Sequence, residues 1–151
     1  MSPQYQHNLK KRIIATVIDY GIFLGLSYAY ITYFGYDNEE GGKTVDGIMT
    51  LPIPIVWTFY FVVVEAVYGA TIGHQAMDLK VITDTRKEIN GIQALQRHLV
   101  DPIDILFYGI PAIITILNSE KHQRLGDMWA KTIVVDKKDT RQYSLIETQN
   151  N

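Results

Sequence analysis

The hydrophobic residues of the chain gather in three blocks that are separated by polar segments. The first block, residues 13–33, follows Lys10, Lys11 and Arg12 and contains one charged residue, Asp19. Because a bilayer core takes about 20 apolar helical residues, this block is long enough to cross it. Basic residues before the block and tyrosines at its far end are typical of the two flanks of a transmembrane helix. The pattern predicts a first transmembrane helix with a carboxylate inside it.

The second block, residues 48–68, predicts another transmembrane helix. Its only charge is Glu65, near the end of the block. Pro52 and Pro54 fall in the first turns, where the missing N–H group is tolerated. The helix therefore begins near residue 48 or, alternatively, at Pro54.

The third block, residues 102–117, is shorter, carries Asp104 and is interrupted at 109–111 by Gly-Ile-Pro. At about 1.5 Å per residue it reaches roughly 24 Å, less than the bilayer core. Lysine and arginine number three before the first block, one in 35–47, four in 69–101 and six after 117. The positive-inside rule then places the N-terminus, 69–101 and the tail in the cytoplasm. This favours a broken or re-entrant third helix over one that spans.

The fold class expected from this pattern is an all-α membrane protein, a small bundle with two transmembrane helices and a third short, broken or re-entrant one. An amphipathic helix is predicted over 91–100. Short strands are predicted at 79–83 and 132–135 in the cytoplasmic loops, where they could pair as a small sheet. Residues 1–9 are expected to be flexible, and 137–151 form a polar tail.

The composition of the chain narrows the range of possible functions. The chain has 151 residues, no cysteine and a net charge of −2, which excludes disulfide chemistry and a strongly basic nucleic-acid binder. The histidines His7, His74, His98 and His122 lack metal-ligand spacing and are expected at the surface. No nucleophile motif occurs. We therefore expect no enzyme activity, no cofactor and no metal, and a lipid bilayer as the main partner.

The charged residues of the apolar blocks are the candidate site. Arg12 and Asp19 share one helical stripe but lie roughly 10 Å apart along the axis, too far for direct contact. Other charged residues are expected close to these two. The candidate partners of Asp19 are Arg97, His98 and Arg124. Arg97 and Asp101 have the i,i+4 spacing of an ion pair on one helix. Acids inside a membrane helix are often functional, which indicates a proton or cation site. The alternative is an ion-pair network that fixes the fold, the stronger interpretation for Glu65, Asp101 and Asp104.

A second stripe on the first helix consists of the small residues Gly21, Gly25 and Ala29. Small residues four apart allow close helix packing in membranes. The expected use is packing within the chain or in a homodimer.

In combination, these residues resemble the RDD family of small bacterial membrane proteins, named for one arginine and two aspartates. Arg12, Asp19 and Asp127 match the three defining charges, and the resemblance covers about residues 10–136. Residues 70–74 (Ala-Thr-Ile-Gly-His) are similar to the loop that follows the family's second helix, with His74 where lysine is usual. The resemblance implies a pair between Arg12 and Asp127, and a partner for Asp19 in Arg124 or Arg97.

Two functions follow as expectations. The resemblance implies transport of a cation or proton, with Asp19 as the titrating or coordinating group, in the bacterial inner membrane with a cytoplasmic N-terminus. Two or three helices are too few to enclose a transport path across the membrane, so a homo-oligomer is expected. The alternative is a non-transporting scaffold or accessory subunit that binds a partner protein through its cytoplasmic loops. A membrane enzyme ranks last.

Overall fold

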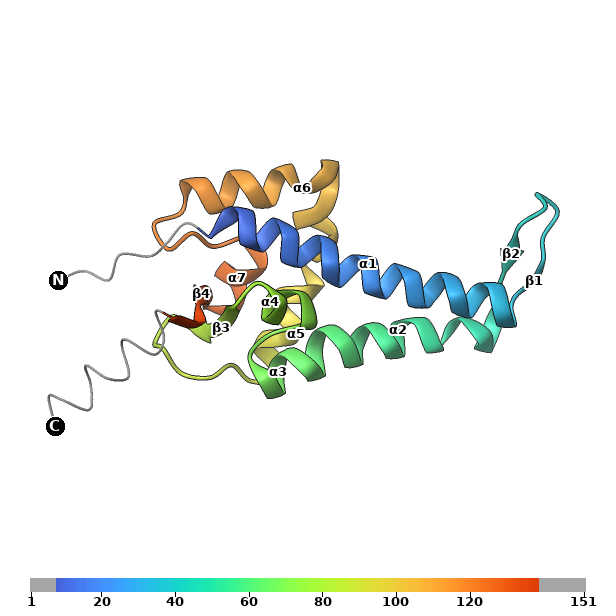
Figure 1. The fold of residues 1–151 in the computed structure, drawn as a ribbon, viewed down its shortest axis with the longest axis horizontal. Helices are drawn as coiled ribbons and strands as arrows, with labels where there is room; N and C mark the ends of the chain where they lie inside the picture. Colours follow the sequence, from blue (N-terminus) through green and yellow to red (C-terminus); the bar gives the residue numbers. More distant parts are fainter. Residues whose placement is uncertain (1–7, 139–151) are drawn as a thin grey trace, which may run out of the picture.

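A long helical hairpin dominates the computed structural model, which describes residues 8–138 and, for 105–108, the backbone alone. Helix α1 (Leu9–Phe34) runs beside a second helical segment, and a small hairpin of β1 (Tyr36–Asp37) and β2 (Lys43–Thr44) joins their far ends (Figure 1). Both helical segments are long and apolar enough to cross a membrane. The two predicted transmembrane helices are thus confirmed. The predicted flexible N-terminus and polar tail lie almost wholly outside the described residues.

The second segment is not the uninterrupted helix that the sequence predicts. It opens with a 3-10 turn (Gly47–Thr50), and α2 (Pro52–Trp57) begins at Pro52 rather than Pro54. A π-helical stretch, η2 (Thr58–Val63), then leads into α3 (Val64–Tyr68). The wider π turn changes the angular register, which buries three consecutive side chains, Tyr60, Phe61 and Val62. Helix α3 ends at Tyr68, and the next residue, Gly69, has a φ of +68°, the left-handed conformation that glycine adopts without strain.

The burial pattern of helix α1 is the reverse of the pattern seen in helices of water-soluble proteins. Its buried residues are Arg12, Ala15 and Asp19, which share one stripe in the first half of the helix. Apolar side chains face outward, among them Val17 at 67% and Leu24 at 60% exposure. Exposed apolar and buried charged residues suit a helix whose outer surface meets lipid.

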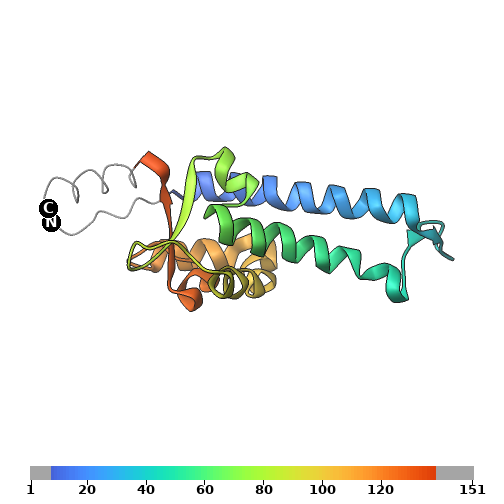
Figure 2. The same ribbon diagram turned by 90° about the horizontal axis from the view of Figure 1, so that it is seen from below.

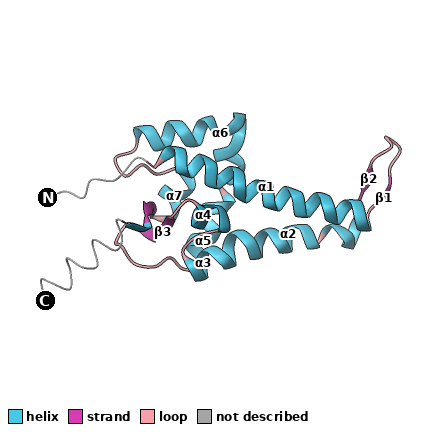
Figure 3. Ribbon diagram, viewed as in Figure 1, coloured by secondary structure: helices cyan, strands magenta, loops and turns pink. Residues whose placement is uncertain are grey.

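The remaining elements pack around one end of the hairpin, opposite β1 and β2 (Figures 1 and 3). They are α4 (Ile72–Ala76), β3 (Leu79–Thr83), α5 (Gly91–Leu99), α6 (Asp101–Asn118), α7 (Leu125–Ala130) and β4 (Thr132–Asp136). Strands β3 and β4 pair antiparallel, from Leu79 opposite Asp136 to Thr83 opposite Thr132. The predicted pairing of these strands is confirmed.

The third apolar block is bent. The helical segments Gly91–Asp104 and Gly109–Asn118 meet at 115°, and Gly109 has a φ of +83°. The second segment then runs back beside the first half of α1 (Figures 1 and 2). The structure therefore contains the broken, re-entrant-like third helix that the Gly-Ile-Pro interruption predicts.

Candidate functional site

A cluster of buried charged side chains fills the space between the hairpin and the elements that pack around its end opposite β1 and β2. We call it the buried charge cluster, and none of its members is more than 8% exposed. Five carboxylates and three guanidiniums give it a formal charge of −2 while both histidines are neutral. The members are Arg12, Asp19, Glu65, His74, Arg97, His98, Asp101, Asp104, Arg124 and Asp127.

Six members form a closed ring in which acids and bases alternate. Arg97 Nε lies 2.8 Å from Glu65 Oε1, and Arg97 Nη1 contacts Asp127 Oδ1. Arg124 joins Asp127 to Asp101, through Nε at 3.5 Å and Nη1 at 2.8 Å respectively. A histidine closes the ring, since the two nitrogens of His98 lie 2.7 Å from Asp101 and 3.3 Å from Glu65.

Asp127 is the centre of this arrangement because three arginines converge on it. Arg12 Nη2 lies 2.5 Å from Asp127 Oδ2, while Arg97 and Arg124 contact Oδ1. The backbone N–H of Arg124 also donates to Oδ2, at 3.1 Å. Burial alone would raise the pKa of the Asp127 carboxyl, but the three guanidiniums outweigh burial and hold that pKa below its usual range. The pair between Arg12 and Asp127 that the family resemblance implies is present.

The expected i,i+4 pair between Arg97 and Asp101 is wrong. Asp101 instead contacts His98 Nδ1 at 2.7 Å and Arg124 Nη1 at 2.8 Å. Arg97 instead bridges Glu65 and Asp127, and it donates to Thr132 Oγ1 at 3.1 Å.

Arg124 and Asp104 hold the start of α7. Asp104 accepts hydrogen bonds from the backbone N–H groups of Leu125 and Gly126, at 3.3 and 3.2 Å. Gly126 packs against the backbone of Arg97, where a Cβ atom would come within 3.2 Å of the Arg97 Cα. Burial alone would lower the pKa of the Arg124 guanidinium, but the surrounding carboxylates raise it, so this group stays charged.

Asp19 is bound by donors other than arginine, so its expected pairing with Arg97, His98 or Arg124 is wrong. Oδ1 accepts from the Tyr60 hydroxyl at 2.8 Å and from the Gly73 N–H at 2.7 Å. Oδ2 accepts from the Thr71 hydroxyl at 2.6 Å.

The remaining contact of Asp19 is His74, whose Nδ1 lies 3.2 Å from Oδ2 and 2.8 Å from the Thr71 hydroxyl oxygen. With Asp19 ionised, this geometry places the ring proton of a neutral His74 on Nδ1. Burial lowers the pKa of His74, and the nearby positive charge of Arg97 lowers it further. Asp19 and Glu65 raise this pKa, but their effect is smaller, so the pKa stays below its usual value. His74 is therefore neutral at neutral pH.

Close packing of α4 on α1 brings these donors to Asp19. A Cβ atom on Gly73 would overlap the Ala15 carbonyl oxygen and lie 2.7 Å from the Asp19 Cγ. Only glycine fits at this crossing without movement of one helix. Thr71 precedes α4 and gives its hydroxyl to Asp19 rather than to the helix N-terminus.

The histidines were expected at the surface, which is wrong for two of them. His74 is 6% exposed and His98 3% exposed, and both belong to the buried charge cluster. His122 is half-buried, and its backbone carbonyl accepts from Arg12 Nη1 at 2.6 Å. His7 lies outside the described residues.

Sequence reasoning missed the neutral partners of the buried acids. Tyr60 and Thr71 bind Asp19, and the hydroxyl of Tyr20 donates to Asp101 Oδ2 at 2.7 Å. A buried carboxylate is stabilised by neutral hydrogen-bond donors as well as by cations, so hydroxyl side chains are possible partners alongside arginines. The position of Thr71 in the loop after the second helix was the available signal.

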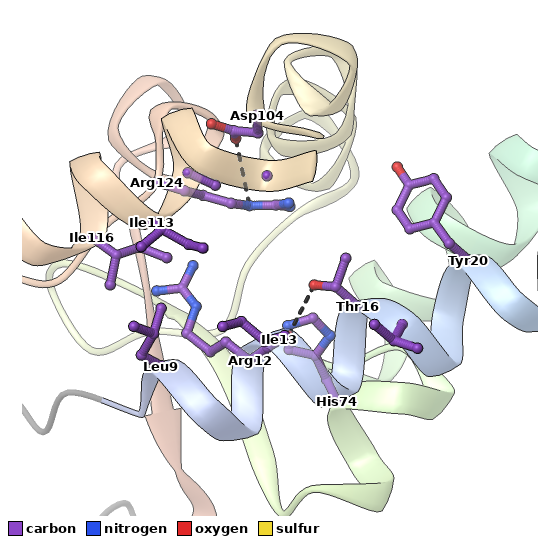
Figure 4. Close-up of a pocket in the computed structure, with 13 residues that line it drawn as sticks. Leu9, Arg12, Ile13, Thr16, Tyr20, His74, Asp104, Ile113, Ile116 and Arg124 are labelled. Carbon is purple, nitrogen blue, oxygen red and sulfur yellow. Dashed lines mark hydrogen bonds and ion pairs between the residues drawn. The ribbon is translucent and has the colours of Figure 1, made fainter. Parts of the chain in front are cut away.

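A cavity of about 310 Å³ lies between α1 and the second segment of α6 (Figure 4). Its polar lining includes Arg12, His74, Asp104 and Arg124, and most of the other side chains around it are apolar. His74 is thus shared between the cavity and Asp19. Over the described residues, no group of three or more acidic or histidine side chains is placed to hold a metal ion.

The small-residue stripe does not serve packing within the chain. Ideal Cβ atoms on Gly21 and Gly25 would meet nothing within 4 Å in the described structure, and Ala29 is exposed. Packing in a homodimer stays a prediction for this stripe.

A family model described as the RDD family matches residues 7–131. No curated protein and no solved structure matches the chain.

Proposed function

The chain belongs to the RDD family of membrane proteins, and we propose that it moves protons across the membrane as a homo-oligomer. The proton-exchanging group is the pair of Asp19 and His74. The proposal includes no enzyme activity. It places the chain in the bacterial inner membrane with the inner end of the hairpin, and the N-terminus, in the cytoplasm.

The observation that carries the proposal is the contact between a cavity-lining histidine and a carboxylate buried in an apolar helix. His74 borders the cavity, and its Nδ1 faces Asp19 Oδ2 at 3.2 Å. A proton that arrives at Nε2 allows the Nδ1 proton to pass to Asp19, which leaves a neutral acid and the other histidine tautomer. Ionisable residues inside membrane helices form proton relays of this kind.

The charge balance of the site also favours proton uptake. The buried charge cluster carries −2 with both histidines neutral, so up to two protons reduce its charge rather than add to it. Asp19 is held by hydroxyl, amide and imidazole donors rather than by a guanidinium. A carboxylate without a permanent cation beside it is easier to protonate than one such as Asp127.

Proton flux into proteoliposomes tests the proposal. A pH gradient is applied to vesicles with native protein, with Asp19→Asn, and with Asp37→Asn as a matched control at a surface carboxylate whose side chain is 88% exposed. We expect flux above empty vesicles for the native chain and the control, and a loss of about tenfold or more in Asp19→Asn. Equal flux in native and Asp19→Asn vesicles, or none above empty vesicles, refutes it.

A non-transporting scaffold is the second candidate, and the alternating ring favours it. Glu65, Arg97, Asp127, Arg124, Asp101 and His98 pair with one another in a way that fixes the inner elements on the hairpin. Such a rigid platform suits docking of a protein through 69–101 and 118–139. A specific co-purifying protein that is lost on mutation of these loops supports this candidate.

A further inference from the structure

The lining of the cavity between α1 and α6 includes two basic side chains, a few other polar side chains and a larger number of apolar ones. Arg12 and Arg124 both extend toward it, with Ile13, Ile113 and Ile116 around them (Figure 4). Its volume, about 310 Å³, is in the range of small-molecule sites. A space with this lining suits an amphiphile that has an anionic head.

The height of Arg12 along α1 matches the headgroup layer of a bilayer. Twenty-two residues separate Arg12 from Phe34 at the aromatic end of the helix, which is about 33 Å at 1.5 Å per residue. This length is close to the roughly 30 Å thickness of the hydrocarbon core. With the tyrosines of the far end at one interface, Arg12 lies at the depth of the other interface.

The cavity also borders the surface that faces lipid tails. Ile13 and Val17 line it, and they are 42% and 67% exposed on the outside of α1. An acyl chain can therefore extend from the cavity into the bilayer along these side chains.

Arg124 retains unused hydrogen-bonding capacity. Its Nη2 is buried and has no hydrogen-bond partner among the described residues, although Nη1 and Nε face carboxylates. A guanidinium has five donors, and a buried donor without a partner is costly. The one carboxylate in the cavity lining, Asp104, accepts from the backbone of α7 and is thus occupied.

We propose that this cavity binds an anionic phospholipid from the inner leaflet. The phosphate lies against Arg12 and Arg124, and one acyl chain follows Ile13, Val17 and Ile113. Basic pockets between membrane helices on the cytoplasmic side bind anionic headgroups in this way. Free phosphate carries the same charged group as the lipid headgroup. It would leave the apolar side chains of the cavity without an apolar contact, so the lipid is the occupant.

Lipid retention on the purified chain tests the proposal without any mutation. Protein in mild detergent is incubated with phosphatidylglycerol, phosphatidylcholine or inorganic phosphate, and bound species are counted by native mass spectrometry. We expect about one phosphatidylglycerol per chain and at least about tenfold less phosphatidylcholine. Equal retention of the two lipids overturns the proposal, and so does displacement of phosphatidylglycerol by equimolar inorganic phosphate.

A variant whose larger side chain fills the cavity provides a second test of lipid binding. Ala112 lines the cavity and is half-buried, whereas Ala76 is exposed on α4 and outside it, so Ala112→Phe and Ala76→Phe form a matched pair. We expect Ala112→Phe to lower phosphatidylglycerol retention about tenfold and Ala76→Phe to leave it unchanged. Equal retention by both variants places the lipid elsewhere and overturns the assignment. Proton flux is measured separately, so the lipid site and the transport proposal can fail independently.

Discussion

Replacing Asp127 with asparagine should destabilise the protein more than any loss of a surface charge. The substitution keeps the size of the side chain but removes the negative charge on which Arg12, Arg97 and Arg124 converge. Three buried guanidiniums would then face one another, with Glu65 and Asp101 as their nearest remaining acids. Removing one partner of a buried ion pair costs about 3–5 kcal/mol.

The assay is thermal unfolding of the purified protein in detergent, with Glu88→Gln as the matched control. Glu88 pairs with Lys80, but its side chain is 87% exposed, so its loss should cost at most about 1 kcal/mol. For a chain of this length about 1 kcal/mol shifts Tm by roughly 2–4 °C, so Asp127→Asn should lower Tm by about 6–20 °C. A Tm loss in Asp127→Asn no greater than in Glu88→Gln would refute the view that Asp127 holds the cluster together.

Three further results are expected. Gly73→Ala should lose about 1–3 kcal/mol in the same unfolding assay, because the added methyl group overlaps Ala15 and Asp19; native-like stability would mean that α4 does not cross α1 this closely. Burial lowers the pKa of His74 below 6.5, so as pH falls through 6.5 the unfolded state takes up a proton that the folded state does not, and stability should fall. His74→Gln should remove that part of the pH dependence, and an unchanged pH profile would contradict the assignment. Gly21→Leu meets no neighbour in the chain, so it should leave monomer stability within about 0.5 kcal/mol while light scattering detects any loss of oligomer.

The hairpin and the bent third helix could be predicted because the local composition of a segment determines whether it can cross a bilayer. A run of apolar residues with basic and aromatic flanks is a property of one segment, and the Gly-Ile-Pro interruption marks the break in α6. Strand pairing between 79–83 and 132–136 was also readable from local patterns. The π stretch over 58–63 was not, because its wider turn serves contacts with other elements rather than a preference of its own residues.

The partners of the buried acids could be predicted only in part. The family pattern implied the pair of Arg12 and Asp127, which the structure contains. The neighbours of Asp19 depend on how the loop after the second helix folds back on α1, a tertiary contact that no spacing encodes. Reasoning from charge alone assigned arginines to Asp19, whereas Tyr60, Thr71 and His74 supply its side-chain contacts.

The central claim is that a proton reaches Asp19 through His74. Infrared difference spectroscopy between neutral and acidic pH measures this directly, because a protonated carboxyl group has a C=O band that a carboxylate lacks. The account predicts that acidification of the native protein produces such a band, that Asp19→Asn removes the part of the band that arises from Asp19, and that His74→Gln changes the pH at which this part appears. A band of the same intensity in native protein and in Asp19→Asn would contradict the account.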